Sequence, residues 1–233
     1  MSASTPTPVV RRSALEARHE ALGATFASDV DRWPRHYGDA DAERVAVSTG
    51  AGLAELGPYG EVLLRGPGSA DLVTRLTGGA SSSQRSVIRA TLGGRIGAAW
   101  CLGPDEVLLV AAAGPWTDDL AEHLSGADVS AMDMTGARTT LRLAGPAAPA
   151  ILAELCQADT TPRSMADGAL VQAPLAGVRA FTTRLDADGA PGYTMMVARD
   201  EAAYVWDALR EIGAAHGLVP VGPDAVGADG GTR

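Results

Sequence analysis

The chain contains no lysine. All 19 of its basic residues are arginines, against 28 acidic residues, which gives a net charge of −9 over 233 residues. Without lysine the protein cannot form a Schiff base with pyridoxal phosphate, act as a lysine-dependent aldolase or hold a phosphate in a Walker A loop. The acidic balance also argues against a nucleic-acid partner, because phosphates require a basic surface. We therefore expect neither pyridoxal phosphate chemistry nor nucleic-acid binding.

Cysteine and long apolar runs are scarce as well. Cys101 and Cys156 are far apart, and four scattered histidines show no metal-ligand spacing, so neither a disulfide framework nor a metal site is expected. No apolar run approaches the roughly 20 residues that a membrane helix needs. The Arg11-Arg12 pair does not lead into the apolar segment of an export signal. These absences predict a cytoplasmic protein with no membrane partner.

The composition is that of a folded chain. Hydrophobic residues make up 46% of the sequence, and surface scaling predicts that about 70% of the extended surface is buried on folding. We expect disordered ends at residues 1–12 and 221–233 around a folded region at 13–220. Two α+β halves are expected at about 13–130 and 131–220, and the chain can exchange between them.

The same combination of strand, Gly-Pro turn and helix occurs twice. Proline in the first turn of a helix sacrifices no hydrogen bond, and glycine permits the sharp turn before it. The two copies lie 79 residues apart: strand 61–65, Gly66-Pro67 and helix 69–76, then strand 140–144, Gly145-Pro146 and helix 147–155.

A second strand followed by a helix completes each copy. The apolar strands are 106–112 and 192–197, and each runs into a segment with helical spacing of apolar residues. Two such halves, each a sheet with helices on one face, predict an α+β protein with internal pseudo-symmetry.

The first ordered element is expected to be a helix from about Ala14. Ser13 and Glu16 have the spacing of a capping box. His19 and His123 are then expected on helix surfaces, and a structural role is favoured over general-base work for the histidines.

Several short sequence segments, taken in order along the chain, resemble the tetrahydrofolate-dependent glycine-cleavage T protein family of aminomethyltransferases. The similarity spans about residues 20–220 and stops where the family's C-terminal barrel would begin. It implies two ferredoxin-like halves of the folate-binding T-protein fold and a transferase of one-carbon metabolism. The segments are Leu22–Phe26, Trp33–Gly38, Thr49–Leu56, Arg65–Pro67, Gly93-Gly94, Leu108–Val110, Leu141–Pro146, Pro191–Tyr193 and His216–Leu218.

The positions to which the resemblance assigns acidic residues are not acidic here. Gly97 and Ala98 stand where the family carries an acidic pair, one member of which acts at the folate nitrogen. Ala190 stands where a glutamate grips the two N–H donors of the pterin edge. Arg85 replaces an aromatic residue. We therefore expect a diverged active site in which tetrahydrofolate binding is weak or lost.

A ligand cavity is expected between the two halves. Aromatic side chains suit a flat heterocycle, and arginines suit an anion, with core packing and solvated strand ends as equal alternatives. No catalytic residue can be named from the sequence. The expected ligand-binding residues are Tyr59, Arg85, Arg89, Trp100, Arg184 and Tyr193.

Three functions remain open from the sequence. The first is a T-protein-like small-molecule-binding protein, a diverged homologue of the tetrahydrofolate-type one-carbon transferases. The second is a non-catalytic subunit of a flavin amine oxidase complex, similar to the small subunit of sarcosine oxidase. The third is an enzyme, such as a cyclase, that has been repurposed to a non-folate substrate and acts by orienting that substrate in the former folate pocket. The expected partners are a small-molecule ligand and either a partner subunit or a second copy of the chain.

Overall fold

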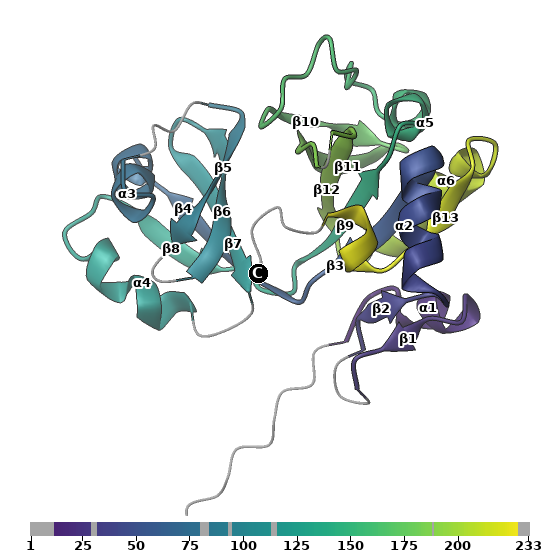
Figure 1. Ribbon diagram of the computed structural model, residues 1–233. Helices are drawn as coiled ribbons and strands as arrows, with labels where there is room; N and C mark the ends of the chain where they lie inside the picture. Colours follow the sequence, from purple (N-terminus) through teal and green to yellow (C-terminus); the bar gives the residue numbers. More distant parts are fainter. Residues whose placement is uncertain are drawn as a thin grey trace, which may run out of the picture.

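Two β-sheets lie side by side, with helices on the face of each sheet that points away from the other (Figure 1). The computed structural model describes residues 12–28, 32–79, 84–92, 95–112, 116–187 and 189–227. A small N-terminal unit of α1 (Glu16–Ala21), β1 (Thr25–Phe26) and β2 (Pro34–His36) lies beside the second sheet.

The first sheet has five antiparallel strands in the order β5-β6-β7-β4-β8. Helices α3 and α4 pack against it. The elements are β4 (Tyr59–Arg65), α3 (Ser69–Leu76), β5 (Ser86–Leu92), β6 (Arg95–Gly103), β7 (Glu106–Ala112), α4 (Trp116–Leu124) and β8 (Ser130–Asp133).

The second sheet has six strands in the order β10-β11-β12-β9-β3-β13, of which only β13 runs parallel to its neighbour. Its elements are α2 (Ala40–Thr49), β3 (Ala51–Leu56), β9 (Arg138–Ala144), α5 (Ala148–Leu155), β10 (Leu170–Leu175), β11 (Val178–Arg184), β12 (Gly192–Ala198), α6 (Ala202–Ala214), β13 (Leu218–Pro220) and the 3₁₀ helix η1 (Pro223–Val226).

The structure confirms the predicted repeat. The order β5-β6-β7-β4 in one sheet matches β10-β11-β12-β9 in the other. In the first half the Ser69 amide donates to the Gly66 carbonyl at 3.0 Å, and in the second the Ala148 amide donates to the Gly145 carbonyl at 3.0 Å. Both glycines have positive φ, 143° and 120°. The two halves are therefore pseudo-symmetric down to the hydrogen bonds of their turns.

The halves exchange a strand reciprocally. Strand β3 precedes β4 in the chain but pairs with β9, and β8 precedes β9 but pairs with β4. A backbone hydrogen bond joins the residues at the start of each exchanged strand to the Gly-Pro turn of the other half. The Gly68 amide donates to the Asp128 carbonyl at 3.2 Å, and the Ala147 amide donates to the Gly50 carbonyl at 3.0 Å.

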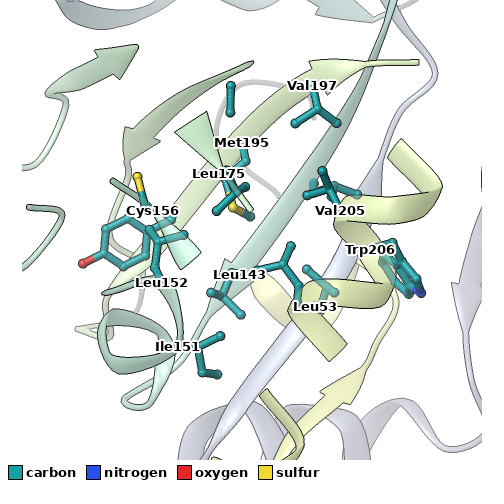
Figure 2. Close-up of a cluster of buried hydrophobic side chains, with 14 of the residues drawn as sticks. Leu53, Leu143, Ile151, Leu152, Cys156, Leu175, Met195, Val197, Val205 and Trp206 are labelled. Atoms are coloured by element: carbon teal, nitrogen blue, oxygen red, sulfur yellow. The ribbon is translucent and has the colours of Figure 1, made fainter. Parts of the chain in front are cut away.

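Successive side chains along each strand point to opposite faces of the sheet. The apolar residues are therefore divided between an outer core under the helices and an inner core between the two sheets. On β4, Val62 and Leu64 pack toward α3, whereas Leu63 packs between the sheets. Figure 2 shows the outer core of the second sheet, where Leu53 and Leu143 from neighbouring strands meet Val205 of α6. The inner core contains Trp100 from the first sheet and Met196 from the second.

Two expectations at the chain ends need correction. Helix α1 begins at Glu16, because the Ser13 hydroxyl accepts from the Leu15 amide at 2.8 Å and donates to a distant carboxylate instead of closing a capping box. Residues 221–227, expected in a disordered tail, form η1, and Val226 is buried. The boundaries of the halves along the chain stay a prediction.

No helix among the described residues is long and apolar enough to cross a membrane.

Gly145→Ala should destabilise the protein by about 2–5 kcal/mol. A left-handed conformation costs a residue with a Cβ about 1–2 kcal/mol, and a steric clash in a packed site adds about 1–3 kcal/mol. A Cβ at Gly145 would lie 2.5 Å from the Val47 carbonyl oxygen and 2.6 Å from that of Gly50. Urea unfolding measures the loss.

Gly177→Ala is the matched control. Gly177 also has a positive φ, 82°, but a Cβ there meets nothing within 4 Å. Its loss should therefore stay near the 1–2 kcal/mol of backbone strain alone. Equal losses for the two variants would show that the turn at Gly145 is not sterically constrained.

Candidate functional site

A pocket of about 470 Å³ lies where the β3–β4 connection crosses the β8–β9 connection. We call it the crossing pocket. Its lining is pseudo-symmetric, since Tyr59 and Arg138, and likewise Glu61 and Thr140, are each 79 residues apart. It is lined by Arg12, Trp33, Glu55, Leu56, Pro58, Tyr59, Glu61, Asp133, Thr135, Gly136, Arg138, Thr139, Thr140 and Arg199.

A buried ion pair lies in the wall of the crossing pocket. Arg138 Nη1 donates to Glu61 Oε2 at 2.8 Å, and the Glu61 side chain is only 3% exposed. Burial raises the pKa of Glu61 above its ordinary value, and the hydrogen bond from Arg138 opposes that shift. The Arg138 guanidinium also lies 5.6 Å from the centre of the Phe181 ring. Arg138 is therefore neutralised within the chain.

A second carboxylate of the pocket, Glu55, belongs to a buried network. Glu55 Oε2 lies 2.7 Å from Nε2 of His19, and Nδ1 of His19 lies 2.6 Å from the Tyr37 hydroxyl. The Ser13 hydroxyl donates to the same oxygen of Glu55. The expectation that His19 lies on a helix surface is wrong, because His19 is fully buried and its ring meets Trp206 edge-on at 5.2 Å.

His19 links a phenol to a carboxylate. Burial raises the pKa of Tyr37, so the phenol keeps its proton at neutral pH. Its hydroxyl meets Nδ1 of the imidazole, and Nε2 of the same ring meets Glu55. The network therefore runs without a break from Tyr37 through His19 to Glu55.

A buried arginine lies on β9 on the face of the sheet opposite the outer core. Arg142 is 1% exposed and donates to the Val226 carbonyl at 2.8 Å, to the Leu185 carbonyl at 2.9 Å and to the Thr194 hydroxyl at 3.0 Å. All three acceptors are neutral, and burial lowers the pKa of Arg142 to about 10. The guanidinium stays charged at neutral pH and joins β9, β12 and η1.

The three aromatic residues expected at the ligand site lie in different parts of the fold. Tyr59 lines the crossing pocket, whereas Trp100 is buried between the sheets and Tyr193 lies in the outer core of the second sheet. The Tyr193 hydroxyl donates to the Thr160 carbonyl at 2.8 Å, and burial raises the pKa of Tyr193 to about 12. A wider groove of about 950 Å³ between the sheets is lined by none of the six expected ligand-binding residues.

The three expected arginines occupy different surroundings. Arg85 and Arg89 are exposed, at the start of β5 and along it. Arg184 is bidentate to Asp186 at 2.9 and 2.5 Å and also donates to the Met165 carbonyl at 2.8 Å. The expected role of these side chains at a ligand site stays a prediction.

The three positions at which the family resemblance places acidic residues for folate do not provide those side chains here. A Cβ at Gly97 would lie 2.5 Å from the Val110 carbonyl oxygen and 2.7 Å from the Ala111 Cβ, so no acidic side chain has room there. Ala98 is 5% exposed and packed in the core between the sheets. Ala190 lies in a turn in which it exchanges two hydrogen bonds with Ala187. None of the three offers a carboxylate to the pterin edge.

Sequence reasoning missed the residues that carry the buried charges. A signal existed for Arg142, because an arginine between two leucines in an apolar strand must find acceptors inside the protein. No comparable signal marked Glu55, whose partners lie 36 and 42 residues earlier in the chain. No group of three or more metal-ligating side chains occurs among the residues that the structure describes.

The family model of the GCVT N-terminal domain matches residues 15–228. The chain belongs to this family. It is 34% identical over 226 residues to an aminomethyltransferase of Streptomyces coelicolor, a match that covers 91% of this chain and 60% of that protein. A second aminomethyltransferase, from Streptomyces avermitilis, is 34% identical over 235 residues, with 95% of this chain and 61% of the relative covered. The chain thus spans about 60% of the length of these curated relatives.

Two solved structures show the same GCVT N-terminal fold. The glycine cleavage system aminomethyltransferase T from Bartonella henselae superimposes with a TM-score of 0.76 at 21% identity, covering 93% of this chain and 61% of the other. A chain of the heterotetrameric sarcosine oxidase from Corynebacterium sp. U-96, solved with pyrrole 2-carboxylate, gives a TM-score of 0.62 at 25% identity. That match covers 77% of this chain and 93% of the other. The predicted α+β fold of two T-protein halves is confirmed.

Arg142→Met should loosen η1 without unfolding the sheets. The change removes the charged donor of the Val226 carbonyl, a bond worth about 1.5–3 kcal/mol. Hydrogen exchange of the amides at residues 224–227 should therefore quicken by about tenfold or more, whereas exchange in α5 stays as it is.

Arg179→Met is the control, since Arg179 is an exposed arginine in the same sheet, on β11, which β12 separates from β9. Unchanged exchange at residues 224–227 in the Arg142 variant would show that other contacts hold η1.

Proposed function

We propose that this chain is a T-protein-type small-molecule-binding protein, a diverged homologue of the tetrahydrofolate-type one-carbon transferases in which tetrahydrofolate binding is weak or lost. Membership of the GCVT N-terminal domain family supports the T-protein-type function. The observation that carries the weakened or lost tetrahydrofolate binding is the steric constraint at Gly97, where the Val110 carbonyl leaves no room for an acidic side chain.

The three altered positions support the same conclusion from different physical causes. At Gly97 the backbone of β7 lies too close, and at Ala98 the neighbouring apolar core would surround a charge. At Ala190 the side chain is partly exposed, so the turn could carry a longer residue. Ala190 is thus the one position of the three at which restoring the carboxylate is structurally feasible.

Tetrahydrofolate should bind the wild-type chain weakly, and Ala190→Glu should improve its affinity by at least about tenfold. A carboxylate facing two N–H donors gains charge-assisted hydrogen bonds worth about 1.5–3 kcal/mol each, and 1.4 kcal/mol corresponds to a factor of ten. Titration calorimetry measures both affinities.

Ala190→Gln is the size-matched control, because it adds the same length without the charge and should gain much less. Ala98→Asp alone should not improve binding. A micromolar or tighter affinity in the wild type would contradict the proposal, since other groups would then have replaced the lost carboxylate.

A second candidate function is a non-catalytic subunit of a flavin amine oxidase complex. The observation that favours it is structural, since the chain superimposes on a chain of the heterotetrameric sarcosine oxidase with a TM-score of 0.62 at 25% identity. If this function holds, the tagged chain purified from its own cells should co-elute with a stoichiometric partner that has flavin absorbance. Elution of the chain alone, without flavin, would count against it.

A further inference from the structure

Glu55 is a buried carboxylate with one oxygen bonded inside the protein and the other open to the crossing pocket. Its side chain is 3% exposed, and its two bonded neighbours are Ser13 and His19. Both bonds end on Oε2. Within the part of the chain that the structure describes, no hydrogen bond reaches Oε1, although Glu55 lines the crossing pocket. A buried carboxylate in this state attracts a cation that can donate an N–H.

The arginines in the same wall do not supply that cation. Arg138 is paired with Glu61 at 2.8 Å, and Arg12 is paired with Glu16 at 2.8 Å. Arg199 donates to the Arg12 carbonyl at 2.5 Å. Among the described residues, then, none of the three guanidiniums donates to the second oxygen of Glu55, which leaves that oxygen to a ligand.

The remaining wall suits an organic ligand. Trp33 and Tyr59 contribute aromatic rings, which attract cations as well as apolar groups. The volume of about 470 Å³ lies within the range of small-molecule sites, roughly 300–1,000 Å³. The network through His19 to Tyr37 fixes the carboxylate in place, so the ligand need not order it.

We propose that the crossing pocket binds a small organic amine in its ammonium form, with an N–H donated to Glu55 and the apolar part against Trp33 and Tyr59. This assignment rests on the proposed small-molecule function and names the chemical class of the ligand. It requires no carboxylate at Ala190 and no tetrahydrofolate.

Three probes of nearly equal shape test the assignment on the intact chain: benzylamine, benzyl alcohol and benzoate. Calorimetric titration at neutral pH should show benzylamine binding at least about tenfold more tightly than benzyl alcohol, because only the ammonium makes a charge-assisted bond to Glu55. Benzoate should bind more weakly than either, since the carboxylate of Glu55 repels it.

Glu55→Gln should weaken benzylamine by about tenfold or more and leave benzyl alcohol unchanged, because the amide oxygen still accepts from Ser13 and His19. Glu154→Gln is the matched control. Glu154 lies 2.7 Å from Nε2 of His216 in a similar pair, but outside the pocket, and this variant should bind benzylamine like the wild type.

If Glu55→Gln fails to fold, Trp33→Leu replaces it and should weaken benzylamine several-fold. Benzoate binding more tightly than benzylamine would overturn the assignment but keep a small-molecule site, now one for anions. Tetrahydrofolate binding without benzylamine binding would also overturn the assignment, and it too would keep a small-molecule site. Binding of none of the three probes to the folded chain would overturn the assignment, whereas the proposed function is tested separately by the tetrahydrofolate titration.

Discussion

Two backbone hydrogen bonds anchor the architecture, one at each Gly-Pro turn. The amide of Gly68 is bound to the Asp128 carbonyl and that of Ala147 to the Gly50 carbonyl. Each joins the first turn of a helix to the start of a strand that comes from the other half. Because the turn glycines lie against the same carbonyls, the exchanged strands have little freedom to shift register. The crossing of the two connections, and hence the pocket between them, follows from this constraint.

The electrostatics of the interior differ from what the resemblance implied. The carboxylates expected around a pterin are replaced by Gly97, Ala98 and Ala190. Buried ionisable side chains are present instead at Glu55, which is bonded to His19, and at Arg142, whose acceptors are neutral. A buried charge is costly, and its persistence in a fold suggests a use. The acidic member lines a pocket, while the basic member fastens η1 over the second sheet. Glu55 thus lies at a pocket, whereas Arg142 has a structural role in holding η1.

The fold was largely predictable because its signals are local or repeated. The Gly-Pro turns with their flanking strands and helices appear at a fixed spacing, and the helices after the two turns begin within a residue of their expected positions. The site was far less predictable. His19 has the helical spacing of a surface residue as readily as of a buried one, and only the approach of Tyr37 and Glu55 makes it a bridge. Similarly, nothing near Val226 in the sequence shows that its carbonyl receives a guanidinium from β9.

The reciprocal exchange of β3 and β8 has a consequence for how the chain folds. The second sheet cannot be completed from a continuous stretch of sequence, because all five strands of the first sheet lie between β3 and its neighbour β9 in the chain. Contacts of long sequence separation must therefore form before the second sheet closes, which slows folding and favours a single cooperative transition. A ribosome-bound chain that ends after β8 would hold every strand of the first sheet but leave β3 without its neighbour β9. Such a nascent chain is a candidate for chaperone protection until β9 emerges.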